Sequence, residues 1–274
     1  TSLYLREGSL DWLIERICTS SMSSIQLGFY QIMAGEAKCI MAGGADCMSA
    51  APFMVFDARY GKKYGHMELR DSMWDSLTNL GVGPSMGITA ENVADAYGVT
   101  REDMDQYALR SQQRAAAAID AGKFEEEIIP ITVPGPDGGE VVVCRDEGIR
   151  PGTTAETLAG LKPCFLENGS VTAATSSQMT DGAGFVVLMS EEKAAELGVK
   201  PLARFVSFAT GGVPAEVMGV GPIEAVPKAL RKAGLTLEQM DTIELNEAFA
   251  SQALAVIRTL GMDPARVNPW GGAM

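Results

Sequence analysis

The spacing of apolar residues predicts a chain in which helices and strands alternate. Between residues 20 and 33, apolar side chains recur at intervals of 3, 4, 3 and 1, which is typical of an amphipathic helix. This stripe consists of Met22, Ile25, Phe29, Ile32 and Met33. Short apolar runs at 38–42 and 184–189 predict buried strands. The mixture of the two patterns indicates an α/β protein.

Capping and turn signals predict where further elements begin and end. Thr100 with Asp103 forms a box-like helix start, and this helix is expected to run to Ala121, before Gly122. Apolar runs around a Pro-Gly-Pro-Asp-Gly-Gly turn predict a hairpin over 130–144. The other expected features are an N-cap at Ser190, strands at 202–208 and 242–245, helices from Gly221-Pro222 and over 247–260, and a capping box at Thr236 with Gln239.

Composition and charge limit the binding partners and the compartment that we expect for this chain. The chain has 274 residues and a formal net charge of −13, which argues against nucleic acid because phosphate backbones need clustered cations. No uncharged apolar run reaches about 18 residues, so no membrane span is expected. No secretory signal opens the sequence, which favours the cytoplasm, or a mitochondrion or peroxisome in a eukaryote. The densest basic stretch, which we interpret as solvated surface, holds Arg59, Lys62, Lys63 and Arg70.

The cysteines indicate free thiols. There are five, and their spacing matches no metal site and no disulfide framework, so a reducing compartment is expected. Cys39 and Cys47 lie in apolar surroundings and are expected to be small core residues.

Cys18 is the candidate nucleophile. It is followed by Thr-Ser-Ser-Met and opens the predicted helix at 20–33, where unsatisfied N–H groups favour a thiolate. A thiolate at such a place is suited to acyl transfer. The alternative is a buried structural cysteine, and this run by itself does not decide between the two.

Several separated segments resemble one family. They include Met-Gly-Ile-Thr-Ala-Glu-Asn, Thr-Ala-Ala-Thr-Ser-Ser-Gln-Met-Thr-Asp-Gly and Asn-Glu-Ala-Phe-Ala. In order and spacing, these segments resemble the thiolases. The full set of matching segments is 18–22, 42–49, 86–92, 110–115, 171–183, 217–222 and 246–250.

The resemblance implies an α/β fold of layered αβαβα type, with two similar domains and an inserted loop domain, incomplete at both ends. The first domain is expected at 1–49 plus 179–199, the loop domain, which covers the site and binds coenzyme A, at 50–178, and the second domain at 200–274. Glycines such as Gly43 and Gly44 are expected to let backbone approach the site closely.

The resemblance also implies the activity. Cys18 would attack a 3-ketoacyl-CoA and become acylated, and Asn246 would orient a water that binds the enolate oxygen. A helix N-cap is the alternative role for Asn246. The positions that match coenzyme A contacts are Met86, Ala173, Ser177, Ala248 and Phe249. Coenzyme A would be a substrate, and no cofactor or metal is expected.

The stretch Ala174-Thr175-Ser176-Ser177-Gln178 resembles the degradative 3-ketoacyl-CoA thiolases, and the alternative is a biosynthetic enzyme that makes acetoacetyl-CoA. The family's later His-Pro-x-Gly and Cys-x-Gly motifs do not occur in this sequence, so the chain as written is expected to be inactive.

Two other hypotheses remain, a decarboxylating ketoacyl synthase and a coenzyme A-binding fragment without turnover. The family resemblance implies a homodimer or homotetramer, and some relatives have a hydratase–dehydrogenase partner.

Overall fold

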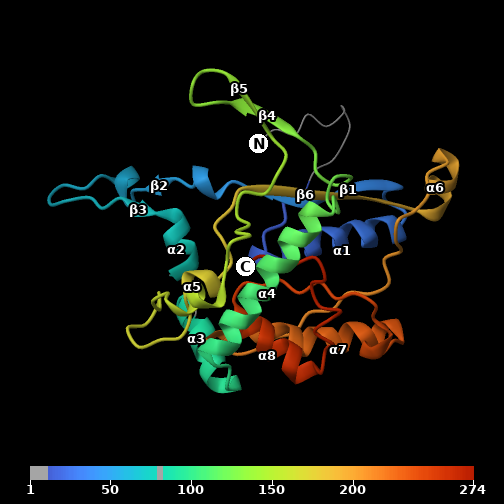
Figure 1. The fold of residues 1–274 in the computed structure, drawn as a ribbon. Coiled ribbons are helices and arrows are strands. Elements are labelled where there is room, and N and C mark those ends of the chain that lie inside the picture. Colours follow the sequence, from blue (N-terminus) through green and yellow to red (C-terminus); the bar gives the residue numbers. More distant parts are fainter. Residues whose placement is uncertain (1–11, 79–82) are drawn as a thin grey trace. The chain divides into compact units, whose positions relative to one another are not determined.

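A computed structural model describes residues 12–78 and 83–274 (Figure 1). The chain divides into two compact units, each of which is described by itself. Unit 1 comprises Thr1–Ala51 and Thr180–Phe208, and unit 2 comprises Pro52–Met179 and Ala209–Met274. The expected division into three domains, with a loop domain at 50–178, stays a prediction.

Unit 1 places a helix against a two-stranded antiparallel sheet. Strand β1 pairs with β6 from Cys39↔Met189 to Asp46↔Gly182, so both predicted strands form. The prediction that they are buried is wrong, because Ala42 is the one buried residue of β1 and residues 182–187 of β6 are exposed. Ser190 caps α6 by accepting the Lys193 N–H at 3.2 Å. The elements of unit 1 are η1 (Ile17–Thr19), α1 (Ser20–Met33), β1 (Cys39–Asp46), η2 (Met48–Ala50), β6 (Gly182–Met189) and α6 (Glu191–Leu197).

Helix α1 packs through small residues and not through the whole predicted apolar stripe. Ser23 and Gly28 are its buried residues, whereas Met22 and Met33 are exposed. A Cβ added at Gly28 would lie 2.9 Å from the Leu188 side chain, so helix and sheet approach closely there. The helix prediction is confirmed, but of the predicted stripe Met22 and Met33 are exposed, whereas Ile25 and Ile32 lie on the side of the helix that Gly28 shares.

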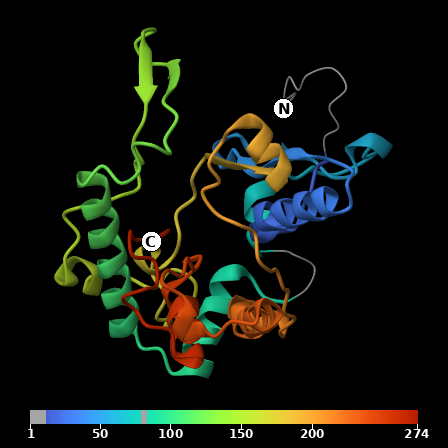
Figure 2. The same cartoon turned by 90° about the vertical axis from the view of Figure 1, so that its right-hand side faces the viewer.

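Unit 2 contains the larger core. Figures 1 and 2 show α3, α4 and α8 gathered together, with α7 beside α8. Buried residues between them include Ala90, Met104, Val171 and Val256. The elements of unit 2 are β2 (Phe53–Met54), η3 (Ala58–Tyr60), β3 (Arg70–Asp71), α2 (Ser72–Thr78), α3 (Met86–Tyr97), α4 (Arg101–Asp120), β4 (Ile131–Pro134), β5 (Glu140–Val143), α5 (Ala155–Ala159), η4 (Ala173–Thr175), η5 (Ala215–Val220), α7 (Gly221–Ala233), η6 (Leu237–Gln239) and α8 (Ala250–Leu260).

Capping and turn residues in the sequence correctly predicted where most of these elements lie. Helix α4 begins after Thr100 with a full capping box, and Gly122 follows it with φ +68°. Strands β4 and β5 pair as the predicted hairpin, which projects away from the helices of unit 2 in both views (Figures 1 and 2). Helix α7 opens at Gly221, and the Thr236 box is present at η6.

Two predicted strands do not form. Residues 202–208 adopt no strand, and Leu202 and Val206 are exposed, because an apolar run becomes a strand only beside a matching ladder. Residues 242–245 make one parallel bridge, Ile243↔Val267. There the Asn268 side chain, and not a neighbouring strand, bonds both backbone groups of Leu245.

None of the helices in the described part of the chain has the length and hydropathy of a bilayer span.

All five cysteines are free and exposed, so the expectation that Cys39 and Cys47 are core residues is wrong. Cys39 is the first residue of β1 and Cys47 follows its last residue, so both lie outside the tight contact between α1 and the sheet.

Candidate active site

Cys18 lies in η1, directly before α1, and is exposed. The predicted place at a helix start is therefore confirmed. Side chains close the turn around it: the Thr19 hydroxyl donates to the Arg16 carbonyl at 2.9 Å, and the Ser20 hydroxyl donates to the Ile17 carbonyl at 2.7 Å. Ser20 also accepts the Arg16 N–H at 2.8 Å. The small hydroxyl residues after Cys18 thus hold the turn that presents the thiol.

The residue before Cys18 has a strained backbone. Ile17 has φ +52°, which is uncommon for any side chain and an outlier for a β-branched one. Its N–H donates to the Glu15 carboxylate at 2.6 Å, and its carbonyl accepts from Ser20. Such a conformation persists only where surrounding contacts over-determine it, and it is found most often at functional sites.

The glycine pair of β1 allows α1 to lie directly on the strand. A Cβ at Gly44 would come 2.6 Å from Ser21 Oγ, and the Ser24 hydroxyl donates to the Gly43 carbonyl at 3.2 Å. Ser21 and Ser24 belong to the first turns of the helix that Cys18 precedes. Gly44 thus permits the close approach of α1, whereas a Cβ at Gly43 would lie 2.1 Å from the Gly184 carbonyl oxygen of β6. The expectation that this pair lets backbone approach the active site stays a prediction.

Two other motif residues meet in unit 1. The Asp181 carboxylate accepts the Ser49 N–H at 2.9 Å and also the Ser49 hydroxyl. These hydrogen bonds hold the pKa of Asp181 below its usual value. The end of β1 and the start of β6 are thereby joined beyond their ladder.

In unit 2, three residues predicted to contact coenzyme A lie together. The Ser177 N–H donates to the Ala248 carbonyl at 3.0 Å, and Ser176 forms an antiparallel bridge with Phe249. Ala173 lies in η4, four residues before Ser177. Segments more than 70 residues apart in sequence therefore form one short extended pair.

This pairing changes where α8 begins. Phe249 has φ −146° and ψ +146° and is the N-cap, so the helix starts at Ala250. The prediction of a helix from residue 247 is wrong, and so is the alternative that Asn246 caps it, since Phe249 is extended and is itself the N-cap. Asn246 is exposed and precedes the pair by two residues.

An aromatic contact connects Met86 to this pair through its neighbour. A Cβ at Gly87 would lie 2.1 Å from the Phe165 ring, so the ring rests on the backbone next to Met86. Phe165 also makes an edge contact with Phe249, with centroids 6.1 Å apart. Phe165 was missed in the sequence, where it follows Pro-Cys in a loop without periodicity.

Sequence reasoning also missed two buried carboxylates. Glu91 is 5% exposed and accepts the Ser170 N–H at 2.9 Å and the Val171 N–H at 3.0 Å, which holds the loop that leads to Ala173. Glu247 is 2% exposed and follows Asn246 directly. Each lies among small apolar residues in its motif, and a charged residue in such a context is the signal that could have revealed them.

Cys18 belongs to unit 1, whereas Asn246, Ser177, Ala248, Phe249, Met86 and Ala173 belong to unit 2. The structure brings together Ser177, Ala248 and Phe249, with Ala173 on the same segment. The basic side chains of Arg59, Lys62 and Lys63 are exposed, and Arg70 is ion-paired with Asp75 at 2.7 Å.

Comparison with known proteins identifies the family. Residues 5–192 match the model of the thiolase N-terminal domain, and residues 199–274 match that of the thiolase C-terminal domain. The chain belongs to the thiolase family. An acetyl-CoA acetyltransferase of Pseudomonas aeruginosa is 49% identical over 266 residues, which are 95% of this chain and 67% of that protein.

Solved structures support the same family assignment. The human mitochondrial 3-ketoacyl-CoA thiolase superposes with a TM-score of 0.90 at 44% identity, over 93% of this chain and 65% of that one. The acetyl-CoA acetyltransferase of Bacillus anthracis gives the same TM-score, identity and coverage. The chain thus has a thiolase-like α/β fold and spans about two thirds of the length of these relatives.

Proposed function

We propose that the protein is a thiolase that cleaves 3-ketoacyl-CoA with coenzyme A through an acyl-Cys18 intermediate. The observation that carries this proposal is the exposed Cys18 thiol in a strained turn at the start of α1. The names of the relatives, acetyl-CoA acetyltransferase and 3-ketoacyl-CoA thiolase, support the same chemistry.

The reaction proceeds in two steps. The Cys18 thiolate attacks the keto carbon, the bond between C2 and C3 breaks, and the acetyl-CoA enolate leaves and takes a proton at C2. A coenzyme A thiol then gives up its proton and attacks the acyl-Cys18 thioester, which releases the Cys18 thiolate and acyl-CoA. In this proposal Asn246 orients the water that binds the enolate oxygen.

The pair formed by Ser176–Ser177 and Ala248–Phe249 is proposed to contact the pantetheine or acyl part of coenzyme A, together with Met86 and Ala173. Support comes from the aromatic and small side chains that meet there, since ligand sites combine apolar surface with a few polar groups. A structure of the human mitochondrial relative in complex with CoA superposes on this chain with a TM-score of 0.88.

Two directions of the reaction are candidates. The run Thr175-Ser176-Ser177 favours degradation, as does the likeness to human 3-ketoacyl-CoA thiolase. The 49% identity to an acetyl-CoA acetyltransferase favours acetoacetyl-CoA synthesis as the second candidate. The ratio of thiolysis rates on long-chain 3-ketoacyl-CoA and on acetoacetyl-CoA distinguishes them, with a preference for long chains expected.

The test of the chemistry is a covalent adduct. We expect the protein as the cell makes it, incubated with acetyl-CoA and no acceptor thiol, to gain one acetyl group on the peptide that contains Cys18. Cys18→Ala should abolish the adduct and lower turnover by at least about 10³-fold, since the covalent route is lost. Cys39→Ala, an exposed cysteine at the end of β1, is the matched control and should keep both. An adduct on any other cysteine would refute the proposal.

A further inference from the structure

Asn246 is an exposed residue between two anchored neighbours. On one side, the Asn268 side chain accepts the Leu245 N–H at 2.7 Å and donates to the Leu245 carbonyl at 2.8 Å. On the other side, the same Asn268 amide donates to the Glu247 carboxylate at 2.8 Å. The backbone that carries Asn246 is therefore fixed immediately before and after it, while its own side chain lies at the surface.

The second anchor is a buried charge. Glu247 is 2% exposed, and its carboxylate accepts the Tyr107 hydroxyl at 2.8 Å and the Ser111 hydroxyl at 2.7 Å. It also accepts the Met274 N–H at 3.3 Å. With Asn268, four donors from three segments meet on this one group. Among the residues that the structure describes, none of the ion pairs includes Glu247.

The groups around Glu247 are well suited to donate hydrogen bonds to its carboxyl oxygens. Burial, and then the charge of Glu247, raise the pKa of Tyr107 well above its usual value, so its hydroxyl keeps its proton. A carboxylate in a buried place costs free energy unless hydrogen bonds satisfy it, and here both oxygens are satisfied by neutral donors.

The carboxylate also joins Asn246 to α4 and to the chain after residue 268. The Gly272 N–H donates to Ser111 Oγ at 3.0 Å, and a Cβ at Gly272 would lie 2.3 Å from the Glu247 carboxyl carbon. The C-terminal end of the chain lies beside α4 in both views (Figures 1 and 2). Helix α4 and the chain after residue 268 therefore have little room to shift independently of Glu247.

We propose that Glu247 is a positioning residue that, through its hydrogen bonds to α4 and Asn268, fixes the Asn246 carboxamide for the carbon–carbon bond step. This inference rests on the proposed thiolase function. It assigns Glu247 no contact with substrate. It implies that Glu247 matters where the enolate oxygen must be bound and not where Cys18 merely exchanges an acetyl group with coenzyme A.

Glu247→Gln tests this because it keeps the shape of the side chain. The amide replaces one accepting oxygen with a donating NH₂ group, which faces the Tyr107, Ser111 or Asn268 donors. We expect the maximal rate of 3-ketoacyl-CoA thiolysis to fall by about 10- to 100-fold, since small misplacement of a catalytic group has such effects. The KM should stay within about twofold, because the interaction lost acts chiefly in the transition state.

The comparison of two reactions of the same variant separates a positioning role from a merely structural one, because a structural defect would lower both rates. Exchange of labelled coenzyme A into acetyl-CoA requires acylation of Cys18 but no carbon–carbon step. Glu247→Gln should keep this exchange within about threefold of the unaltered protein while thiolysis falls. Asp103→Asn, also on α4 but in its first turn and without contact to Glu247, is the control for lost stability and should lower neither rate.

Milder variants keep the test informative if Glu247→Gln folds poorly. Tyr107→Phe and Ser111→Ala each remove one donor, and each should lower thiolysis by about 3- to 10-fold with exchange retained. Equal loss of both reactions in all three variants, or thiolysis equal to that of Asp103→Asn, would overturn the positioning role. Absence of exchange in the unaltered protein would instead refute the thiolase function itself.

Discussion

At the scale of single residues, Gly87 shows how little space separates the helix start at Met86 from the aromatic pair. The Phe165 ring occupies the volume that any Cβ at residue 87 would fill, at 2.1 Å. The same ring contacts Phe249 edge-on. A side chain at residue 87 must therefore displace Phe165, and the displacement reaches a residue proposed to contact coenzyme A.

We expect Gly87→Ala to destabilise the protein by about 1–3 kcal/mol through overpacking. It should also raise the KM for acyl-CoA, because Phe249 loses its neighbour. The measurements are thermal unfolding and initial rates at varied acyl-CoA. Gly160→Ala is the control, since residue 160 has φ −75° and its nearest atom to an added Cβ is 3.6 Å away. Equal KM values for the two variants would show that the Phe165 contact does not reach the binding site.

The sequence predicted individual residues best where chemistry is local. Cys18 lies at a helix start as predicted, because the hydroxyls that shape its turn follow within two residues. The roles of Glu91 and Glu247 could not be predicted, because their donors lie 79 or more residues away along the chain or, for Asn268 and Met274, in a segment without periodicity. The pairing of Ser177 with Ala248 is likewise a long-range contact.

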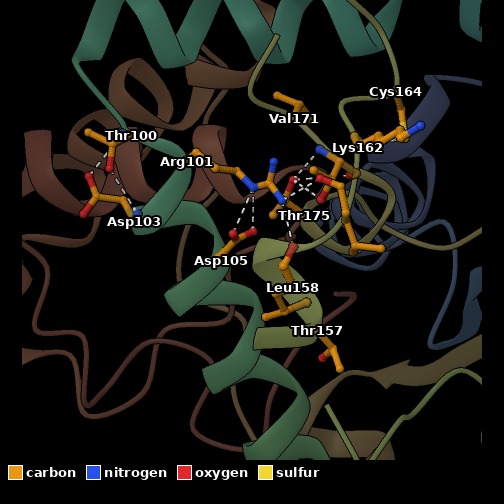
Figure 3. Close-up of polar contacts among 12 residues, drawn as sticks. Thr100, Arg101, Asp103, Asp105, Thr157, Leu158, Lys162, Cys164, Val171 and Thr175 are labelled. Atoms are coloured by element: carbon orange, nitrogen blue, oxygen red, sulfur yellow. Dashed lines mark hydrogen bonds and ion pairs between the residues drawn. The ribbon is translucent and has the colours of Figure 1, made fainter. Parts of the chain in front are cut away.

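At the scale of elements, Asp103 in the first turn of α4 makes three interactions, which are two capping-box hydrogen bonds and one ion pair. Asp103 completes the capping box with Thr100 and forms an ion pair with Arg258 of α8 at 2.8 Å (Figure 3 shows the capping box). Arg101, the first residue of α4, pairs with Asp105 one turn later at 2.9 Å and donates to the Leu158 carbonyl at 2.7 Å, which ties α4 to α5. The helix start is thus joined to two other helices of unit 2.

Asp103→Asn should lower the stability of the protein by about 1 kcal/mol at neutral pH through the weakened cap and the lost ion pair. The hydrogen bond from Arg258 holds the pKa of Asp103 below its ordinary value of 3.8. The stabilisation is therefore complete above 3.8 and is lost as pH falls through the lowered value. Unfolding curves of both proteins should differ at pH 7 and converge in strong acid, and a difference that persists there would contradict this origin.

Elements with local start and stop signals, such as α4 and the β4–β5 hairpin, were predicted almost to the residue. The prediction was wrong at 202–208 and at the start of α8, where the outcome depends on what the backbone meets. A side-chain amide replaces the expected neighbouring strand at Leu245, and the bond from Ser177 to Ala248 delays α8. Propensity does not encode such tertiary partners.

At the scale of the whole molecule, burial is distributed unevenly between the two units. Both clusters of buried apolar residues lie in unit 2, and they include Met104, Val171 and Val256. In the described part of unit 1, the buried apolar residues are Ala42 and Ala194. Since apolar burial is the main favourable contribution to folding, we expect unit 2 to hold most of the stability of this chain.

Met104→Ala tests this distribution. Met104 is fully buried in the larger cluster, and its truncation should cost about 2–5 kcal/mol by leaving a cavity. Hydrogen exchange should show faster opening of the α4 and α8 amides, with a smaller change in β1 and β6, because no residue of the cluster belongs to unit 1. Met67→Ala, at an exposed methionine, should leave the pattern unchanged. Similar exchange in the two variants would mean that the packing around Met104 contributes little, and stability would then have to come from elsewhere in the chain.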